Sequence, residues 1–254
     1  AETEDDAFLQ QMVQFLENPI NLNKVSTEDL NALHILTPMQ VHSLVQYRQL
    51  FGNLLSVYEA QAIPGWDVAT LERLKPYITV RQETRVASSI ASRLRNGEST
   101  LLLRATQVLE KSKGYLLDST TANNYYPGSP QRLFIRYKYN YKNLLQYGFV
   151  AEKDPGEEFF KGSQKQGFDY YSFHFYARDI GIIKTLALGD YTVNLGQGLT
   201  QWMSLAFKKG PDISSIKRQS ATIRPYNSAG EINFRRGAAI TLAKNKWEVR
   251  VFES

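Results

Sequence analysis

The sequence of 254 residues contains no cysteine and only three histidines. The absence of cysteine excludes disulfide frameworks, thiol nucleophiles and cysteine-based zinc or iron–sulfur sites. Three histidines do not favour a multi-histidine metal centre, so we expect neither a metal nor a cofactor. Long apolar runs are also missing, because none approaches the roughly 20 residues that a membrane-spanning helix needs. The hydrophobic content of 43% nevertheless excludes a disordered chain.

Charge is distributed unevenly along the chain. Residues 1–80 carry four basic and ten acidic side chains, a net charge of −6. Residues 81–254 carry 26 basic and 15 acidic side chains. An acidic segment joined to a basic one favours two domains in different surroundings. We therefore expect a multidomain α+β protein, with a boundary near residue 80.

The acidic segment has the periodicity of helices. Residues 7–17 place apolar side chains at helical spacing and Asn18-Pro19 ends that pattern, so residues 1–19 are expected to form an N-terminal helix. Residues 20–80 then contain two rounds of helix, turn and helix about thirty residues apart, which is a short internal repeat. Ser26 or Thr27, Pro38 and Ser56 stand where helices of these rounds are expected to begin.

The motifs Ile20-Asn-Leu-Asn, Tyr47-Arg48 and Leu74-Lys-Pro-Tyr-Ile-Thr-Val80 stand in the order found in a known domain. This order resembles the tandem helix-hairpin-helix domain of competence-type DNA receptors, over residues 20–80. The resemblance implies binding to the DNA backbone, through a Gly-hydrophobic-Gly turn whose backbone N–H groups point at a phosphate. The basic side chains available for such binding are Arg48, Arg73 and Lys75.

Both turns depart from the family pattern. β-branched residues stand at the two glycine positions of the first turn, and they resist the positive φ that such a turn requires. The second turn keeps one glycine but has an aspartate, which would repel a phosphate, at the other position. We therefore expect the hairpins to dock another envelope protein, with DNA binding as the alternative, because phosphate contacts come from Lys and Arg and this module is acidic. The hairpin positions concerned are Ile35, Thr37, Pro38, Gly65, Trp66 and Asp67.

From about residue 99 the hydrophobic period changes from 3.6 to 2. Residues 132–141 and 169–179 alternate apolar or aromatic side chains with polar ones, which predicts half-buried strands. We expect residues 81–98 to be a linker and residues 99–254 to be an antiparallel sheet of about eight strands. The other candidate strands are 100–109, 144–152, 182–194, 197–208, 235–244 and 246–254.

Strands of about 9–11 residues with one apolar and one charged face fit two architectures. A soluble sandwich would bury the apolar face against a second sheet, whereas an outer-membrane barrel would turn it toward lipid. Short connections at Asn143 and Asn245 alternate with long polar loops and aromatics gather near strand ends, which favours the barrel. We expect Asp190 to pair with an arginine of the barrel interior, Arg136 or Arg178. The basic interior positions are Arg104, Arg132, Arg136, Lys138 and Arg178.

Residues 188–199 resemble a segment of outer-membrane barrels of Bacteroidota-type bacteria. That group includes a family of unassigned function in which a helix-hairpin-helix module precedes such a barrel. The resemblance implies an outer-membrane location with residues 1–80 in the periplasm, contact with outer-membrane lipid, and further strands beyond residue 254. No nucleophile signature surrounds Ser172, and His174 is expected to form hydrogen bonds on the polar face. We therefore expect a non-enzymatic role in an envelope transport or assembly complex, with a soluble two-domain binding protein as a rival interpretation.

Overall fold

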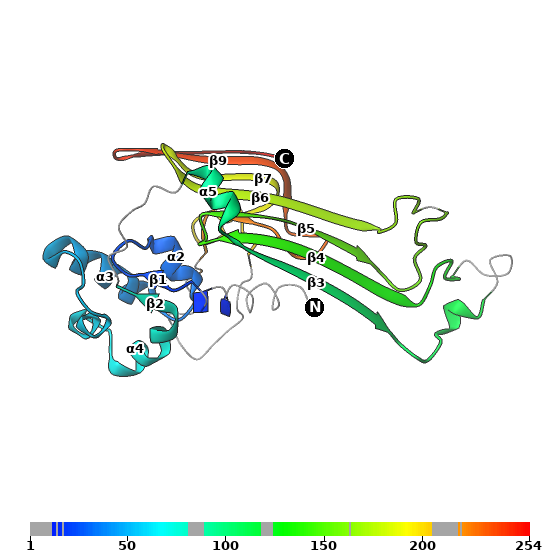
Figure 1. Ribbon diagram of the computed structural model, residues 1–254, viewed down its shortest axis with the longest axis horizontal. Helices are drawn as coiled ribbons and strands as arrows, with labels where there is room; N and C mark the ends of the chain where they lie inside the picture. Colours follow the sequence, from blue (N-terminus) through cyan, green and yellow to red (C-terminus); the bar gives the residue numbers. More distant parts are fainter. Residues whose placement is uncertain are drawn as a thin grey trace. The chain divides into compact units, whose positions relative to one another are not determined.

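The computed structural model of the chain describes residues 12–13, 15–16, 18–80, 89–117, 124–162, 164–204, 218 and 220–254. The chain divides into two compact units. The first, here called the helical unit, comprises residues 1–88 and 192–224; the second, the sheet unit, comprises residues 89–191 and 225–254. The fold is mixed α+β, with one large antiparallel sheet and few helices (Figure 1), in agreement with the expected class.

The helical unit contains the two expected rounds of helix and turn. Its elements are β1 (Ile20–Asn21), α2 (Thr27–Ala32), α3 (Pro38–Phe51), the 3-10 helix η1 (Val57–Ala62), α4 (Val68–Leu74), the 3-10 helix η2 (Lys75–Tyr77) and β2 (Ile78–Thr79). The starts of α2, α3, η1 and α4 are each capped by a side chain that accepts a hydrogen bond from a backbone N–H three residues later, as Ser26 does from Asp29 and Asp67 from Thr70. The predicted helix starts are confirmed.

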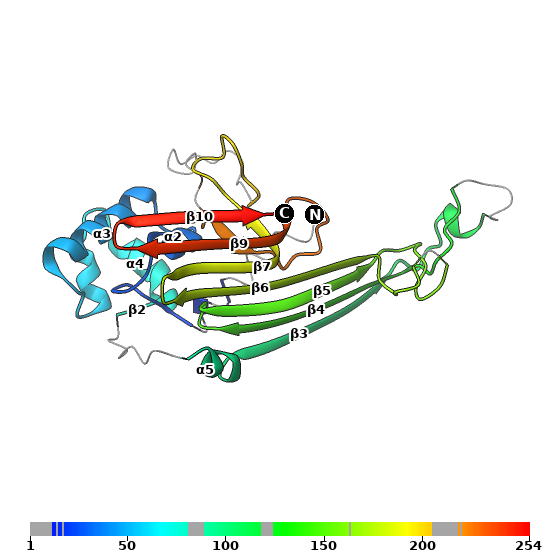
Figure 2. The same cartoon turned by 90° about the horizontal axis from the view of Figure 1, so that it is seen from above.

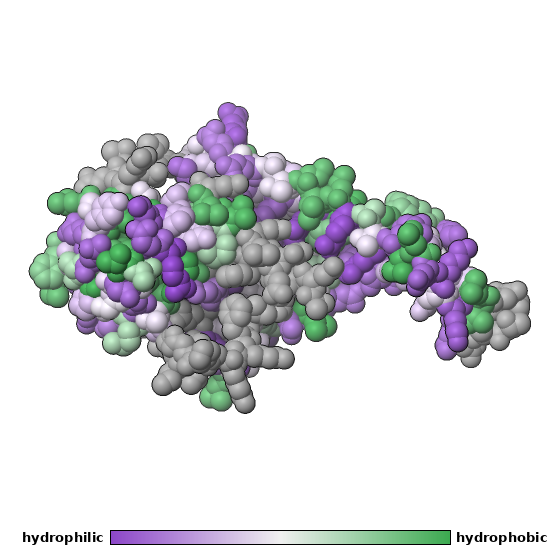
Figure 3. Space-filling view, turned by 90° about the horizontal axis from the view of Figure 1, so that it is seen from below, coloured by the Kyte–Doolittle hydropathy of each residue, from purple (hydrophilic) through white to green (hydrophobic). Residues whose placement is uncertain are grey.

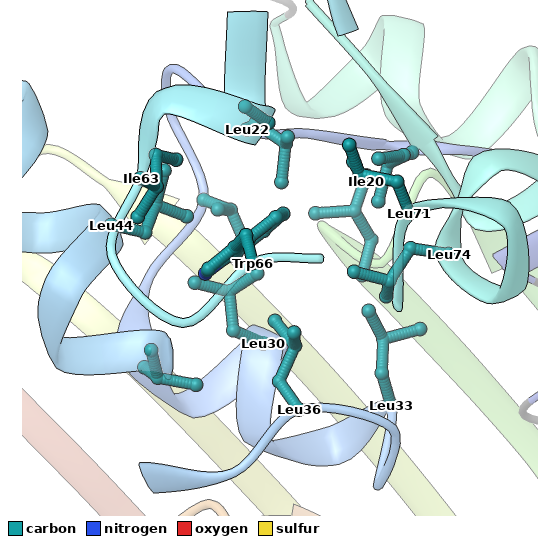
Figure 4. Packing of buried hydrophobic residues seen from close by; sticks show 14 of the residues in the cluster. Ile20, Leu22, Leu30, Leu33, Leu36, Leu44, Ile63, Trp66, Leu71 and Leu74 are labelled. Carbon is teal, nitrogen blue, oxygen red and sulfur yellow. The ribbon is translucent and has the colours of Figure 1, made fainter. Parts of the chain in front are cut away.

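An apolar core holds the helical unit together. Trp66 is only 4% exposed and lies at its centre, and its indole Nε1 donates a hydrogen bond of 3.0 Å to the carbonyl oxygen of Gln40 (Figure 4). Burial of each large aliphatic side chain contributes about 1.5–3 kcal/mol. The core residues seen around Trp66 are Ile20, Leu22, Leu30, Leu33, Leu36, Leu44, Ile63, Leu71 and Leu74.

The large sheet has eight strands. Seven of them follow one another in the order β10-β9-β7-β6-β5-β4-β3 (Figure 2), and β8 pairs with β7. Every pairing along that path is antiparallel. From residue 89 onward the helices and strands are α5 (Ile90–Arg95), β3 (Glu98–Gln107), the 3-10 helix η3 (Lys113–Tyr115), β4 (Gln131–Tyr141), β5 (Leu145–Lys153), β6 (Tyr170–Ile180), β7 (Ile183–Val193), β8 (Ile223–Pro225), β9 (Arg235–Lys244) and β10 (Trp247–Glu253).

The connections between strands differ in length at the two ends of the sheet. Residues 142–144, 181–182 and 245–246 connect neighbouring strands at one end, here called the short-turn end. Asn143 and Asn245 have φ of 57° and 55° there, a conformation that asparagine tolerates in tight turns. The connections after β3, β5 and β7 are all longer and lie at the opposite, long-loop end.

The sheet is open rather than closed. Strands β3 and β10 lie at opposite ends of the strand order, so each has one edge without a neighbouring strand among the described residues. The expected closed barrel is therefore not formed by these strands. A sheet closes only when its first and last strands pair.

Two local predictions need correction. The described part of the predicted strand 197–208, residues 197–204, does not form a strand: Gly196 and Gly198 adopt positive φ (54° and 83°), and a single bridge joins Asn194 to Trp202. Residues 205–208 lie outside the described part of the chain. The expected linker 81–98 contains helix α5, and residues 81–88 are not described.

The predicted N-terminal helix is described only in part. Within residues 7–17, positions 12–13 and 15–16 are helical and the others lie outside the described residues. In the described part of the chain, no helix has the length and apolar character needed to cross a bilayer.

Candidate functional site

The two faces of the large sheet differ in chemistry. Cross-strand partners such as Leu103 and Ile135, or Phe149 and Phe173, place apolar side chains on one side, here called the apolar face. Many of these side chains are exposed, Leu103 by 65% and Phe173 by 54%, whereas Tyr139, near the short-turn end, is buried. The apolar face comprises Leu101, Leu103, Leu133, Ile135, Tyr137, Tyr139, Tyr147, Phe149, Tyr171, Phe173, Phe175, Leu186, Leu188, Ile240, Leu242, Trp247, Val249 and Val251.

The opposite side, here called the polar face, carries the five basic residues singled out from the sequence. The register places Arg104 opposite Phe134, Lys138 opposite Gly148 and Arg178 opposite Thr185 on this side. Arg136, Asn140, Ser172 and His174 are buried there. The sheet is therefore inverted relative to a soluble one-sided sheet, whose buried face is the apolar one. The five basic residues are Arg104, Arg132, Arg136, Lys138 and Arg178.

The basic residues of the polar face are held by different partners. Arg132 forms an ion pair of 2.5 Å with Glu152, which is nearly buried, and one of 3.2 Å with Asp154. The guanidinium groups of Arg104 and Arg136 lie 5.1 and 5.4 Å from the ring centroid of Phe134. Such cation–π contacts stabilise by about 0.5–2 kcal/mol. These contacts fix basic groups on the polar face.

A segment between β8 and β9, residues 226–234, packs on the polar face. Ala229 contacts Phe134 and Val150 in a small apolar cluster. The hydroxyl of Tyr170 donates to the carbonyl oxygen of Gly230 at 3.3 Å, and the rings of Tyr170 and Phe234 meet edge to face at 6.3 Å. Part of the polar face is thus covered by the protein's own chain, and we call residues 226–234 the inner segment.

Asp190 is the acidic centre of this region, but its partner differs from the expected one. Its carboxylate accepts two hydrogen bonds from Arg236, of 2.7 and 2.9 Å, rather than pairing with Arg136 or Arg178. Asp190 stands directly opposite Arg236 in the β7–β9 pairing, next to Gly189, which has φ of +85°. It also accepts a hydrogen bond from the backbone N–H of Phe173 at 3.3 Å.

His174 does not form the hydrogen bonds expected for it. Its two ring nitrogens are buried and have no hydrogen-bond partner among the described residues, and the same is true of the Asn140 side-chain oxygen. The imidazole lies over Gly148, where an added Cβ would come within 3.1 Å of the ring carbon Cε1. Buried polar atoms of this kind are ordinarily satisfied by ordered water.

In the first hairpin turn of the helical unit, backbone N–H groups donate hydrogen bonds to side chains of the same turn. The backbone N–H of Thr37 donates to the Gln40 side-chain oxygen at 2.8 Å, and the N–H of Gln40 donates to the Thr37 hydroxyl at 3.3 Å. Pro38, between them, has no N–H to offer. Ile35 packs against the core. The start of α3 therefore has few donors left for a phosphate.

In the second hairpin turn, too, a backbone N–H donates to a side chain of the same turn. Gly65 has φ of +83°, Trp66 is buried, and the side chain of Asp67 accepts the N–H of Thr70 at 2.8 Å. Hydrogen bonds from Thr70 hold the pKa of the exposed Asp67 carboxyl below its usual value, so the helix start carries a negative charge. Gln40 joins the two turns by donating to the Gly65 carbonyl oxygen at 2.7 Å.

Two of the three basic residues of the helical unit have internal partners. Arg48 donates to the carbonyl oxygen of Val25 at 3.0 Å, and burial lowers its pKa. Lys75 lies over the ring of Tyr58 at 5.4 Å, and a hydrogen bond with Tyr58 raises its pKa. Arg73 is exposed. The three residues therefore do not form one free cationic surface.

An exposed apolar group lies at the end of α3, and the sequence analysis missed it. Leu50, Phe51 and Leu55 are each more than 70% exposed, and Tyr58 of the following 3-10 helix η1 is also exposed. We call these four residues the α3 patch. Figure 3 shows hydrophobic residues among hydrophilic ones on the side of the helical unit seen there. Leu50 and Phe51 stand together at the helix end, and that doublet is the sequence signal that could have identified the patch.

Arg93 of α5 was also missed, because it falls in the expected linker. Its guanidinium is buried and donates to the carbonyl oxygens of Arg178 at 2.5 Å and Asp179 at 3.0 Å. The hydroxyl of Tyr139 donates back to the Arg93 carbonyl oxygen at 2.7 Å. These bonds attach α5 to the short-turn end of the sheet. Ser89, the cap of α5, is the sequence signal that this helix offered.

No cluster of three or more metal-binding side chains occurs in the described part of the chain. A cavity of about 430 Å³ in the helical unit is lined by polar and aliphatic residues of α2, α3 and residues 194–222, without a carboxylate. Comparison with known proteins finds no matching family, no matching curated protein and no matching solved structure.

Proposed function

We propose that this chain is a non-enzymatic outer-membrane β-barrel protein in which residues 20–80 are a periplasmic helix-hairpin-helix module that docks another envelope protein. The inverted sheet carries the proposal: the apolar face is exposed while Arg136 and His174 of the polar face are buried. In water, such a sheet would expose an apolar surface that extends over seven strands, which soluble monomers rarely do. Against acyl chains the same surface is stabilising, and the polar face becomes the interior.

The dimensions of the strands support a membrane location. Strands β4, β6 and β7 have 11 residues each and β5 has nine. A tilted strand needs about 9–11 residues to cross the hydrocarbon core. Tyrosines stand toward both ends of the apolar face, with Tyr139 and Tyr147 stacked at 4.7 Å near the short-turn end and Tyr171 near the long loops. Aromatic residues favour the two membrane interfaces.

The connections between strands support a specific orientation. Outer-membrane barrels have short periplasmic turns and longer external loops, so the short-turn end is assigned to the periplasm. The chain enters β3 from α5 at that same end, where Arg93 contacts the carbonyl oxygens of Arg178 and Asp179. The module that precedes α5 in the sequence is therefore assigned to the periplasm as well.

The geometry of the hairpins supports protein docking over DNA binding. Backbone donors that a phosphate would need are bound by Thr37 and Gln40, and Asp67 adds a negative charge at the second helix start. Residues 1–80 have a net charge of −6, which would oppose the polyanionic backbone. The exposed α3 patch offers instead the kind of apolar surface that marks a protein-binding site.

Membrane fractionation tests the location. We expect the full-length chain to stay with the outer membrane after alkaline carbonate and urea washes, and to be released only by detergent. Recovery in the aqueous fraction without detergent would refute the proposal and favour the soluble two-domain binding protein.

A DNA titration tests the role of the helical unit. We expect Arg73→Glu and Lys75→Glu not to weaken the affinity of the detergent-solubilised chain for a fluorescent DNA duplex. A DNA-uptake receptor, the alternative function, requires salt-dependent binding that these reversals or Arg48→Glu weaken markedly. Val68→Glu, an exposed substitution on α4, is the control for added negative charge alone.

A further inference from the structure

The cavity of about 430 Å³ in the helical unit takes one wall from the faces of two helices. Side chains three and four residues apart share one face of a helix. Thr27 and Asn31 have this spacing on α2. The volume lies within the range of roughly 300–1,000 Å³ that is typical of small-molecule sites. On α3 the lining residues with the same spacing are Pro38, Val41, His42 and Val45.

The opposite wall comes from residues between 194 and 222, and Asn194 fixes its shape. The buried side-chain amide of Asn194 donates to the hydroxyl of Ser220 at 3.2 Å and to the carbonyl oxygen of Ala221 at 3.1 Å. Its backbone N–H donates to the carbonyl oxygen of Thr222 at 2.8 Å. Asn194, Ser220 and Thr222 all line the cavity. Hydrogen bonds within the protein therefore hold this polar wall in position.

Arg218 supplies a cationic group to the same cavity. Its backbone N–H donates to the side-chain oxygen of Gln197 at 2.9 Å, and its carbonyl oxygen accepts from the Gln197 amide at 3.1 Å. Its guanidinium lies 5.4 Å from the ring centroid of Trp202 and so close to Gly198 that an added Cβ there would collide with Nη1. No carboxylate lines the cavity in the described part of the chain, so an anionic ligand would meet no repulsion there.

Asn31 contributes a polar atom that lacks a partner. Its side-chain oxygen is buried and has no hydrogen-bond partner among the described residues. A buried acceptor is ordinarily paired with a donor. A carboxylate has no proton to donate, whereas a hydroxyl group donates and accepts. The cavity therefore favours a ligand that carries hydroxyl groups as well as a negative charge.

We propose that this cavity binds a small organic carboxylate that carries several hydroxyl groups, as a hexuronic acid does. Arg218 pairs with the carboxylate through two parallel N–H···O bonds, Asn31 accepts a hydrogen bond from a ligand hydroxyl, and Val41 and Val45 pack against the C–H groups of the ligand. A carboxylate suits one arginine better than a phosphate, whose second negative charge would lack a partner. The site lies within the helical unit, so this inference goes beyond the proposed function and does not depend on a membrane location.

Isothermal titration calorimetry on the detergent-solubilised full-length chain tests the site. We expect D-glucuronate to bind at least about tenfold more tightly than D-glucose, which lacks the carboxylate, and than propionate, which lacks the hydroxyls. Arg218→Gln should weaken the binding of D-glucuronate about tenfold, because a charge-assisted pair is lost. Asn31→Ala should weaken it about fivefold. Arg95→Gln, which removes an exposed arginine of the sheet unit, is the matched control and should leave the affinity unchanged.

Tryptophan fluorescence locates the bound probe. Because Arg218 lies over Trp202, we expect D-glucuronate to change the emission of that tryptophan. The change should be lost in Trp202→Phe, which keeps an aromatic ring for Arg218, and should persist in Trp247→Phe on β10. A change that persists in Trp202→Phe would place the ligand elsewhere and overturn the inference.

The calorimetric results that would overturn the inference are equally specific. No binding of D-glucuronate at up to about 10 mM, which means an affinity weaker than the millimolar range, would refute the site. Equal affinity for D-glucose, or an unchanged affinity in Arg218→Gln, would refute the pairing with Arg218. Equal affinity for propionate, or an unchanged affinity in Asn31→Ala, would refute the role of the hydroxyl groups. Tighter binding of D-glucose 6-phosphate than of D-glucuronate would refute the carboxylate. None of these results bears on the membrane location, which fractionation tests separately.

Discussion

The helical unit buries an almost wholly apolar core, whereas the sheet unit buries polar and charged side chains beside apolar ones and leaves much of its apolar face exposed. In the helical unit Leu30, Leu44 and Leu74 have no exposed surface. In the sheet unit Asp190 and His174 are 1% exposed, whereas Val251 is 56% exposed. One chain therefore contains two burial patterns. The first is that of a protein module in water, and the second is that of a sheet whose apolar side needs a non-aqueous neighbour.

This difference shows what each part contributes to the proposed function. The helical unit has a complete core and capped helices, so its fold needs no bilayer, and its exposed surface is available for a partner. The sheet unit gains little from burial of its apolar face within the chain itself. Its stability must come from hydrogen-bonded pairing, from contacts on the polar face, and from the solvent that meets the apolar face.

Two tryptophan truncations give the largest expected contrast. Trp66→Ala should lower the free energy of unfolding of the helical unit by about 3–5 kcal/mol, because it leaves a cavity and removes the hydrogen bond to the Gln40 carbonyl oxygen. Trp247→Ala, at an 80% exposed site of the sheet, should cost under about 1 kcal/mol. Urea unfolding followed by far-UV circular dichroism measures both. Equal losses would contradict the contrast between the units.

A charge placed on the apolar face tests whether that face of the sheet unit contacts lipid. Leu103→Arg should cost about 2–4 kcal/mol in lipid bilayers, because arginine would lie near the middle of the hydrocarbon. In a soluble protein the same change at a 65% exposed position should stay within about 0.5 kcal/mol. Thr100→Arg, on the polar face of the same strand, is the control. Unfolding in lipid vesicles distinguishes the two outcomes, and equal tolerance of both variants would exclude lipid contact.

The attachment of α5 to the sheet gives a smaller effect. Arg93→Met should destabilise the sheet unit by about 2 kcal/mol, because the carbonyl oxygens of Arg178 and Asp179 lose a charged donor. Arg95→Met, an exposed change in the same helix, should be nearly neutral. Hydrogen exchange at residues 142–144 and 178–182 provides the measurement. Unchanged exchange in the Arg93 variant would show that α5 does not anchor the short-turn end.

Local sequence patterns were sufficient to predict much of the fold. Alternation over residues 132–141 and 169–179 identified β4 and β6, and it assigned their side chains to two faces before any pairing was known. Ser26, Pro38 and Ser56 identified the starts of α2, α3 and η1. These features depend on neighbours within a few residues, and for that reason they are visible in the sequence.

The remaining features depend on long-range pairing. Asp190 meets Arg236, 46 residues later, because β7 pairs with β9 across a loop, and nothing near Asp190 in the sequence specifies that partner. The hairpin positions Thr37 and Asp67 were identified, but Gln40, which joins the two turns through Gly65, was not. A side-chain hydrogen bond across 25 residues has no local pattern.

The smallest predicted effect concerns a pair of acids at the long-loop end. A hydrogen bond with Asp169, aided by burial, raises the pKa of Glu157 from 4.5 to about 7. Between these values the native loop holds a proton that the unfolded loop lacks, so its stabilisation is complete below pH 4.5 and is lost as the pH rises through about 7. Amides of residues 154–162, corrected for intrinsic rates, should therefore exchange faster at pH 8 than at pH 5. Glu157→Gln, which keeps a donor for Asp169, should abolish this dependence, whereas Glu158→Gln should retain it. The Glu157–Asp169 pair lies outside the capped turns of the helical unit, so amide exchange in those turns should not follow the same pH profile. If both regions showed one profile, the acid pair would not be its source.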